Sequence, residues 1–394
     1  MAATRRIGIE ERRARLGLRH HLAAQAQAST VVEVAQGLVG LHGTDPASVY
    51  LAAIARMRTG EPSIIERALY DERSLVRMLG MRRTMFVVPL ELAPVVHAAC
   101  TRKIAVQERR RLVQHLDQAG VAADPVTWLN DVEESTPCVL EARGEATAAE
   151  LSDDEPRLRT SLLMAEGKPY QARQNISTRV LFLLAADGRI VRGRPRGSWT
   201  SSQYRWSPLQ AWLPGGLAHP PTEAAQLELA RRWLAAFGPG TVADLQWWSG
   251  WTAGDTRRAL DQLDIAEVDL GATIGLVLAD DLEPVAATPP WAALLPALDP
   301  TAMAWSDRGW LLGGHAPALS DRTGNIGPTV WWDGRVVGGW AQRKEGDIVF
   351  RLLEDVGHDA VAALVAAAEL LSHRIGTVRV TPRFRTPLEK ELTA

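Results

Sequence analysis

The sequence is poor in cysteine. Its 394 residues include only two cysteines, Cys100 and Cys138, which show no C-x-x-C spacing. This excludes a disulfide framework and a zinc site built on cysteine pairs. We predict that both cysteines are reduced and lie in the core of a chain that is long enough for two to three domains.

Long apolar segments and targeting patterns are also missing. The longest apolar run, 361–371, falls short of the roughly 18 residues that a membrane span needs. The charged N-terminal stretch lacks the apolar centre of a secretory signal. We therefore expect a cytoplasmic protein, associated with the nucleoid if it is bacterial.

Common catalytic and cofactor motifs are absent too. The sequence contains no G-x-S-x-G, H-E-x-x-H, Walker A or G-x-G-x-x-G motif, and its nine histidines show no metal-ligand spacing. We expect no metal and no cofactor.

A net charge of −2 hides two blocks of opposite sign. Residues 131–155 hold nine acidic residues and one arginine, whereas residues 167–222 hold eight basic residues and one aspartate. The average excludes a globally basic nucleic-acid-binding protein, but it does not exclude a basic surface on one unit. Because charge runs are often only solvated faces, the meaning of the blocks depends on the fold.

The order of predicted elements repeats along the chain. Thr30 and Glu33 have capping-box spacing ahead of a helix, and Asp45 followed by Pro46 begins another. A third helical segment and two β-rich segments follow, in an order that is typical of a winged helix. The order recurs twice with little residue identity. The predicted fold class is α+β, with tandem winged-helix units (helix-turn-helix with a β-wing) and a C-terminal α+β domain.

Four units follow from this order. We predict three winged-helix-like units and a closing domain with these bounds: 1–125, 126–215, 216–285 and 286–394. In the last unit, two β-rich segments flank Asp333-Gly334, a pair that favours a type I′ hairpin turn. A helix over 359–375 should end at Gly376. Most of the fourteen tryptophans should be core residues.

Four segments resemble one known family and occur in its order. These segments are "LVGLHGTDPASVYLA", "LVRMLGMRRTMFVVP", "LLPALDP" and "NIGPTVWWDGRVVGGW". The sequence resembles the winged-helix DNA-binding proteins related to the bacterial AlkZ and YcaQ DNA glycosylases. The resemblance implies tandem winged helices, a C-terminal region with β-structure, and excision of alkylated, often bulky bases from DNA.

The resemblance also places a catalytic motif in the turn of "GLVGLHGTDPASVYLA", residues 37–52. The family motif is Gln-Φ-Gln or Gln-Φ-Asp, with Φ aliphatic, and some members begin it with His. By position, His42, Gly43 and Thr44 correspond to it. His42 matches the His-first form, whereas Gly43 and Thr44 depart from the pattern. Asp45 is the nearby carboxylate, so the candidate catalytic residues are His42, Thr44 and Asp45.

Each candidate also has another reading. A neutral His42 could accept a proton from water, whereas His42 bound against phosphates would be a cation and anchor the DNA. His42 could equally make only hydrogen bonds within the turn. Thr44 offers a hydroxyl without charge. Asp45 could act as a base, or cap the helix that begins at Pro46, which contributes about 1 kcal/mol.

The basic block supplies candidate DNA contacts. Four residues lie in or just before the recognition helix predicted for the second unit: Arg173, Gln174, Asn175 and Arg179. Three more lie in its Gly/Pro-rich wing, which suits phosphates or a minor groove: Arg192, Arg194 and Arg196. The alternative is an exposed wing with solubilising arginines. A β-hairpin contributes to DNA binding in the family, so the resemblance adds Arg335.

Three functions remain open at this point. The preferred hypothesis is a monomeric glycosylase that acts without metal on alkylated purines in double-stranded DNA. The second is a DNA-binding regulator or lesion sensor of the same fold without catalysis. The third, suggested by the acidic block, is a set of winged helices that contact other proteins.

Overall fold

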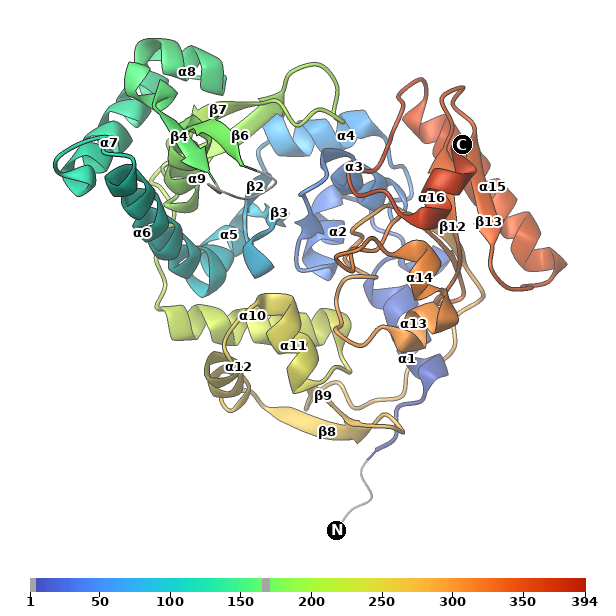
Figure 1. The fold of residues 1–394 in the computed structure, drawn as a ribbon. Coiled ribbons are helices and arrows are strands. Elements are labelled where there is room, and N and C mark those ends of the chain that lie inside the picture. The colour runs from blue at the N-terminus through green and yellow to red at the C-terminus, as the bar shows by residue number, and fades with distance from the viewer. Residues whose placement is uncertain (1–4, 165–170) are drawn as a thin grey trace.

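The computed structural model describes residues 5–164 and 171–394. Figure 1 shows the blue α2–β3 part at the centre, with the teal and green α6–β7 part on one side, the yellow α10–β9 part below, and the C-terminal part on the other side. The described strands form one four-stranded, one three-stranded and three two-stranded sheets. This mixture of helices and small sheets agrees with the predicted α+β class.

The first repeat surrounds the motif turn. It follows α1 (Ile9–Arg19) and consists of α2 (Val31–Gly37), β1 (Leu41–His42), α3 (Pro46–Ile54), α4 (Pro62–Glu66), β2 (Leu75–Leu79) and β3 (Met85–Pro89). The hydroxyl of Thr30 accepts the amide of Glu33 at the start of α2, as its spacing predicts. The strands form an antiparallel sheet in the order β1-β3-β2. The elements therefore follow the order of a winged helix.

The second repeat has the same order and a core of its own. It follows α5 (Ala93–Val96) and α6 (Arg102–Gln118) and consists of α7 (Pro125–Arg143), α8 (Ala148–Asp154), β4 (Ser161–Met164), β5 (Ala172–Asn175), α9 (Ser177–Ala186), β6 (Ile190–Pro195) and β7 (Tyr204–Pro208). Ala146 pairs with Trp206 of β7, just as β1 pairs with β3. A separate cluster of buried residues between 112 and 206 packs this part. The β4–β5 hairpin was not predicted, and part of the basic block, 167–170, lies outside the described residues.

The third repeat shows the order most simply. It consists of α10 (Thr222–Phe237), α11 (Val242–Ser249), α12 (Ala253–Leu260), β8 (Ile265–Asp269) and β9 (Ile274–Leu278). Gly240, ahead of α11, pairs with Leu276 of β9. In all three repeats, the segment ahead of the second helix thus pairs with the last strand of the hairpin. This shared pairing supports repeats that share element order and little residue identity.

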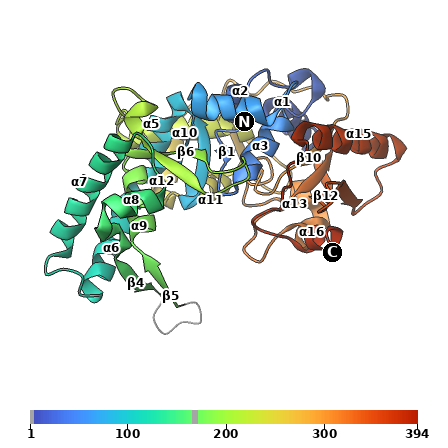
Figure 2. The same ribbon diagram turned by 90° about the horizontal axis from the view of Figure 1, so that it is seen from above.

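The C-terminal part contains the largest sheet. Its elements are β10 (Ala292–Leu295), α13 (Gly309–Leu312), α14 (Ala316–Leu319), β11 (Thr329–Trp332), β12 (Arg335–Gln342), β13 (Ile348–Leu352), α15 (His358–Ile375) and α16 (Pro387–Leu392). The strands are antiparallel in the order β10-β11-β12-β13. The helix predicted to end at Gly376 is α15, and that glycine has a φ of 60°. Figure 2 shows α15 and α16 at the end of the molecule opposite the β4–β5 hairpin.

The predicted hairpin turn is confirmed, and its tip is covered. Asp333 and Gly334 join β11 to β12 with φ angles of 45° and 79°, as a type I′ turn requires. A Cβ atom placed on Gly334 would lie 2.5 Å from Cβ of Arg13. The backbone of α1 therefore approaches the turn so closely that only glycine fits.

The other core predictions are mostly confirmed. Ten tryptophans are buried: Trp199, Trp206, Trp212, Trp233, Trp248, Trp251, Trp291, Trp305, Trp331 and Trp340. Cys100 is buried, as predicted, but Cys138 is exposed on α7. The prediction for Cys138 was wrong because α7 turns that side chain toward solvent, away from the residues that pack the second repeat.

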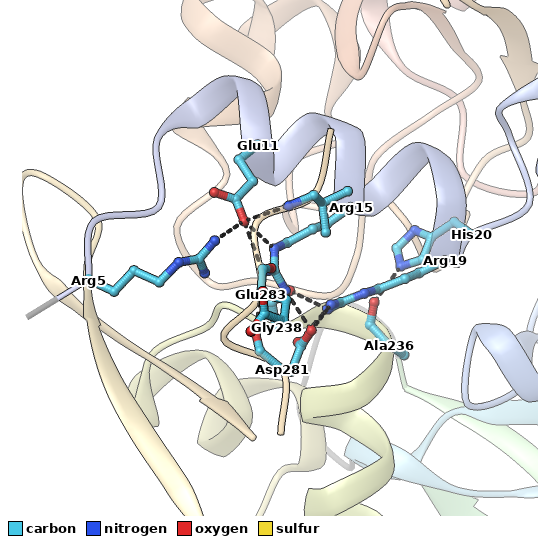
Figure 3. Close-up of polar contacts among 10 residues, drawn as sticks. Arg5, Glu11, Arg15, Arg19, His20, Ala236, Gly238, Asp281 and Glu283 are labelled. Atoms are coloured by element: carbon cyan, nitrogen blue, oxygen red, sulfur yellow. Dashed lines mark hydrogen bonds and ion pairs between the residues drawn. The ribbon is translucent and has the colours of Figure 1, made fainter. Parts of the chain in front are cut away.

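Ion pairs join segments that are far apart in the sequence. Arg15 and Arg19 of α1 both bond Asp281, with Nη1–Oδ1 and Nη2–Oδ1 distances of 2.7 and 2.6 Å (Figure 3). Arg56, just after α3, pairs with Asp299 at 2.6 Å, and neither side chain is exposed. No helix of the described residues is long and apolar enough to cross a bilayer.

Candidate active site

The motif turn is fixed by backbone hydrogen bonds to β3. The amide of Gly43 donates to the carbonyl of Met85 at 2.7 Å, and the amide of Met85 lies 3.3 Å from Oγ1 of Thr44. His42 is the last residue of β1 and pairs with Phe86. The turn therefore continues the sheet and delivers the chain to α3 in a defined geometry.

Gly43 occupies a position with no room for a side chain. Nη1 of Arg77 on β2 donates to the carbonyl of Gly43 at 2.7 Å. A Cβ atom on Gly43 would lie 2.8 Å from that nitrogen, closer than real Cβ contacts. An aliphatic residue at this position would thus displace Arg77. The departure of Gly43 from the aliphatic family pattern has a physical reason in this chain.

His42 is buried and uncharged. Its side chain packs against Phe86 with ring centroids 5.1 Å apart, and its Nδ1 atom is buried without a hydrogen-bond partner. Burial, and to a lesser extent the charge of Arg82, lowers the pKa of His42 to about 3. In the free protein the imidazole is therefore neutral at physiological pH, which does not favour the cationic phosphate anchor considered from the sequence.

Asp45 holds two parts of the chain together. One carboxylate oxygen accepts the amide of Ala47 at 3.1 Å and caps α3, while the other accepts the amide of Arg383 at 2.9 Å. Asp45 is buried, and this burial raises the pKa of its carboxyl group. The capping role weighed from the sequence is present, and the link to the C-terminal segment could not be foreseen.

The residues predicted around the recognition helix lie on two elements. Three of them are exposed on β5: Arg173, Gln174 and Asn175. Arg179 lies in the first turn of α9. Figure 2 shows that the β4–β5 hairpin extends from the body of the molecule. These residues therefore precede or begin the helix, as the sequence indicates, but three of them belong to an extended hairpin.

The three wing arginines point in different directions. The guanidinium of Arg192 lies 4.8 Å from the ring of Trp206, and its Nη1 is 3.2 Å from Sδ of Met85. Arg194 pairs with Asp71 at 2.8 Å. Arg196 is exposed. Only Arg196 occupies the free basic tip that the sequence suggested for all three.

Arg335 lies at the start of β12, where Nη1 pairs with Oε1 of Glu354 at 2.6 Å. Its charge is therefore partly compensated in the free protein. The hairpin tip beside it packs on α1.

Sequence reasoning missed a group of polar residues beside the turn. Arg77 and Tyr50 are buried, at 3% and 1% exposure, and Arg383 lies in the segment that Asp45 binds. One signal was available, since Arg77 is the only charged residue in the apolar strand "LVRML". An arginine in a buried strand needs partners, and it therefore points to a site.

Within residues 5–164 and 171–394, no three His, Cys, Asp or Glu residues are grouped so that they could hold a metal ion.

The repeated helices and hairpins, with the motif turn between β1 and α3, define a class of protein: an α+β protein with a repeated order of elements and a preformed polar turn. The family described as "DNA glycosylase AlkZ-like" matches residues 35–374. The chain belongs to this family.

A solved structure shares the fold. The DNA glycosylase AlkZ of Streptomyces sahachiroi superposes with a TM-score of 0.73 at 21% sequence identity, over 95% of this chain and 99% of that chain. A search among curated proteins found no match. The predicted resemblance is confirmed by the family match, and the predicted fold class by the superposition.

Proposed function

We propose that this protein binds double-stranded DNA and hydrolyses the N-glycosidic bond of an alkylated purine at the turn of His42 and Thr44. One observation carries the proposal: the family match spans this turn, and the turn is held rigid by β3, Arg77 and the helix cap. Rigid placement of polar groups is what positions a water molecule and a sugar for reaction.

The reaction requires little proton transfer to the base. An N7- or N3-alkylated purine carries a positive charge and leaves as a neutral molecule. The protein must then place a water molecule and stabilise a sugar that becomes positive. The Thr44 hydroxyl and the neutral imidazole of His42 are the groups able to hold that water. The Asp45 carboxylate contributes negative potential through space, because backbone amides already occupy its two oxygens.

The basic residues of the second repeat supply the DNA contacts in this proposal. Arg173 on β5 and Arg196 on the wing are exposed and suited to phosphates. Gln174 and Asn175 lie beside Arg173 on β5, and Arg179 follows on α9. Arg335 would approach the duplex from the C-terminal sheet. Affinity for DNA should then fall steeply as salt concentration rises.

A second function, DNA binding without catalysis, is favoured by a specific observation. Both oxygens of Asp45 accept backbone amides, and Thr44 Oγ1 accepts the amide of Met85. The carboxylate of the turn is thus engaged by backbone amides at both oxygens, which favours a structural role for Asp45. A lesion sensor would need only the binding surface.

Base release by the wild-type protein separates these functions. Duplexes with a single N7-methylguanine, a single bulky N7-alkylguanine or normal guanine are incubated with excess protein, and the released base is quantified. Release from an alkylated duplex above the spontaneous rate supports the glycosylase. Lesion-selective binding without release supports the sensor. Binding to no duplex at low salt removes both.

A further inference from the structure

Arg77 is buried with most of its hydrogen-bonding capacity unused. Its Nη1 donates to Gly43, but Nε and Nη2 are buried without a partner. The guanidinium lies 5.0 Å from the ring of Tyr204 on β7. An aromatic ring face attracts a cation, but it accepts no in-plane hydrogen bond. Two donors of Arg77 therefore remain unsatisfied beside the motif turn.

Arg192 brings a second positive charge to the same place. Its Nη1 contacts only the sulfur of Met85, and within the described residues neither Arg77 nor Arg192 has an ion pair. Burial, with a further contribution from Arg77, lowers the pKa of Arg192 to about 10. Two neighbouring guanidinium groups that are partly removed from water repel each other, and a bound anion would stabilise both.

The neighbouring carboxylates form no ion pair with Arg77 or Arg192. The charge of Asp45 acts on Arg77 through space, but the oxygens of Asp45 bond backbone amides and neither arginine. Asp71 and Glu66 lie within 2.8 and 3.6 Å of the nitrogens of Arg194, the next arginine of the same wing. The buried donors of Arg77 and the charge of Arg192 therefore have no bonded anion.

Three tyrosine side chains lie near the arginines: Tyr50 on α3, Tyr70 after α4 and Tyr204 on β7. The hydroxyl of Tyr204 is buried without a hydrogen-bond partner, whereas the hydroxyls of Tyr50 and Tyr70 bond each other. Burial raises the pKa of Tyr204, so its hydroxyl keeps its proton and can donate. Tyr204 and Arg192 are both partly exposed, as are Thr44 and Met85. The cluster thus reaches the surface next to the motif turn.

We propose that Arg77, Arg192 and Tyr204 bind one phosphate group. A guanidinium presents paired donors that match phosphate oxygens, and a phosphate would satisfy both arginines and the tyrosine hydroxyl together. The second step rests on the proposed function: in DNA this group is the backbone phosphate next to the nucleotide whose base is removed. Because Arg77 also bonds Gly43, phosphate binding would be coupled to the position of the turn.

The phosphate site is tested first without DNA. The melting temperature of the full-length protein is measured in sodium phosphate and in sodium chloride of equal ionic strength. A ligand that binds only the folded state raises the melting temperature. We expect a phosphate-specific upward shift in the wild type, its loss in Arg192→Gln and Tyr204→Phe, and its retention in the control Arg322→Gln, which replaces an exposed arginine outside the proposed binding surface. No shift in the wild type, or an equal shift in all four proteins, overturns the site.

Methylphosphonate linkages, which remove the charge of one chosen phosphate, test whether the bound phosphate belongs to the DNA backbone. Fluorescence anisotropy gives the affinity for a duplex containing a tetrahydrofuran abasic site, with the neutral linkage placed at each flanking position. One flanking linkage should weaken binding by the wild type and by Arg322→Gln, but it should not further weaken binding by Arg192→Gln. The salt slope of Arg192→Gln should be smaller by about 0.9.

The outcomes separate the two proposals. If every neutral linkage weakens Arg192→Gln as much as the wild type, the assignment to a DNA phosphate is wrong. If the wild type shows the phosphate-specific melting shift but binds no duplex, the site binds free phosphate and the proposed function is wrong.

Discussion

Replacing His42 should change how the stability of the protein depends on pH. His42 has a folded-state pKa of about 3, against about 6.5 for an unperturbed imidazole. Below pH 6.5 the unfolded chain binds a proton at this histidine, and the folded chain does not. Stability is therefore fully present above pH 6.5 and decreases as the pH falls toward 3.

The expected magnitude follows from the size of the shift. Each pH unit between the two pKa values corresponds to about 1.4 kcal/mol, so His42 should remove about 2 kcal/mol of unfolding free energy between pH 7 and pH 5. The His42→Gln variant lacks this contribution. His20, whose pKa burial also lowers, contributes equally to both proteins and cancels in the comparison.

The assay is urea unfolding at pH 7 and pH 5 for the wild type, His42→Gln and the control His373→Gln, which replaces an exposed histidine. We expect the wild type and the control to lose about 2 kcal/mol more than His42→Gln over this interval. Any constant destabilisation by the substitution cancels in this difference. Equal losses in all three proteins would refute a buried neutral imidazole and with it the proposed state of the turn.

Further predictions concern the turn and the core. Asp45→Ala should lower the unfolding free energy in urea by about 2–4 kcal/mol, because α3 loses its cap and the partly buried amide of Arg383 loses its acceptor. Asp45→Asn keeps one acceptor oxygen and should therefore lose less unfolding free energy. Equal stability of the wild type and both variants would contradict the role of the two Asp45 hydrogen bonds. Arg56→Met should cost about 3–5 kcal/mol by leaving buried Asp299 unpaired, and adding Asp299→Leu should restore part of it. Gly43→Ala places a methyl group against the guanidinium that holds its carbonyl, so base release should slow by up to about 100-fold, measured under single-turnover conditions. Gly8→Ala, where a Cβ meets nothing within 4 Å, is its control and should keep the wild-type rate.

Elements with strong local signals could be predicted from the sequence. Asp45 followed by Pro46 marks the start of α3, and Asp333-Gly334 marks the β11–β12 turn, because capping and type I′ geometry depend on adjacent residues. The β4–β5 hairpin was missed because its strands, SLLM and ARQN, carry no alternating apolar pattern.

The orientation of the wing arginines could not be predicted. Arg192, Arg194 and Arg196 are two residues apart, so a regular strand would place them on one face. The register of β6 against β7 shifts between Arg192 and Pro195, and this irregularity breaks the alternation. Arg192 therefore packs on Trp206 while Arg194 reaches Asp71.

The surroundings of the turn depend on contacts between distant residues. Asp45 meets an amide 338 residues away in the sequence, and Arg77 meets the ring of Tyr204 from another repeat. No local pattern encodes such pairs. The position of the candidate turn could be predicted from local residues, whereas the protonation state of His42 and the partners of the turn depend on the fold.

The central claim is that the turn of His42 and Thr44 carries out base release. Its most direct test is the single-turnover rate of release from an N7-alkylguanine duplex by the wild type, His42→Gln and Thr44→Val, with Thr377→Val as an exposed threonine control. We predict that at least one turn variant releases the base about 100-fold more slowly while binding the duplex normally, as expected for loss of a group that positions or accepts a proton from water. Wild-type rates in both turn variants, or no release by the wild type from a duplex that it binds, would contradict the claim.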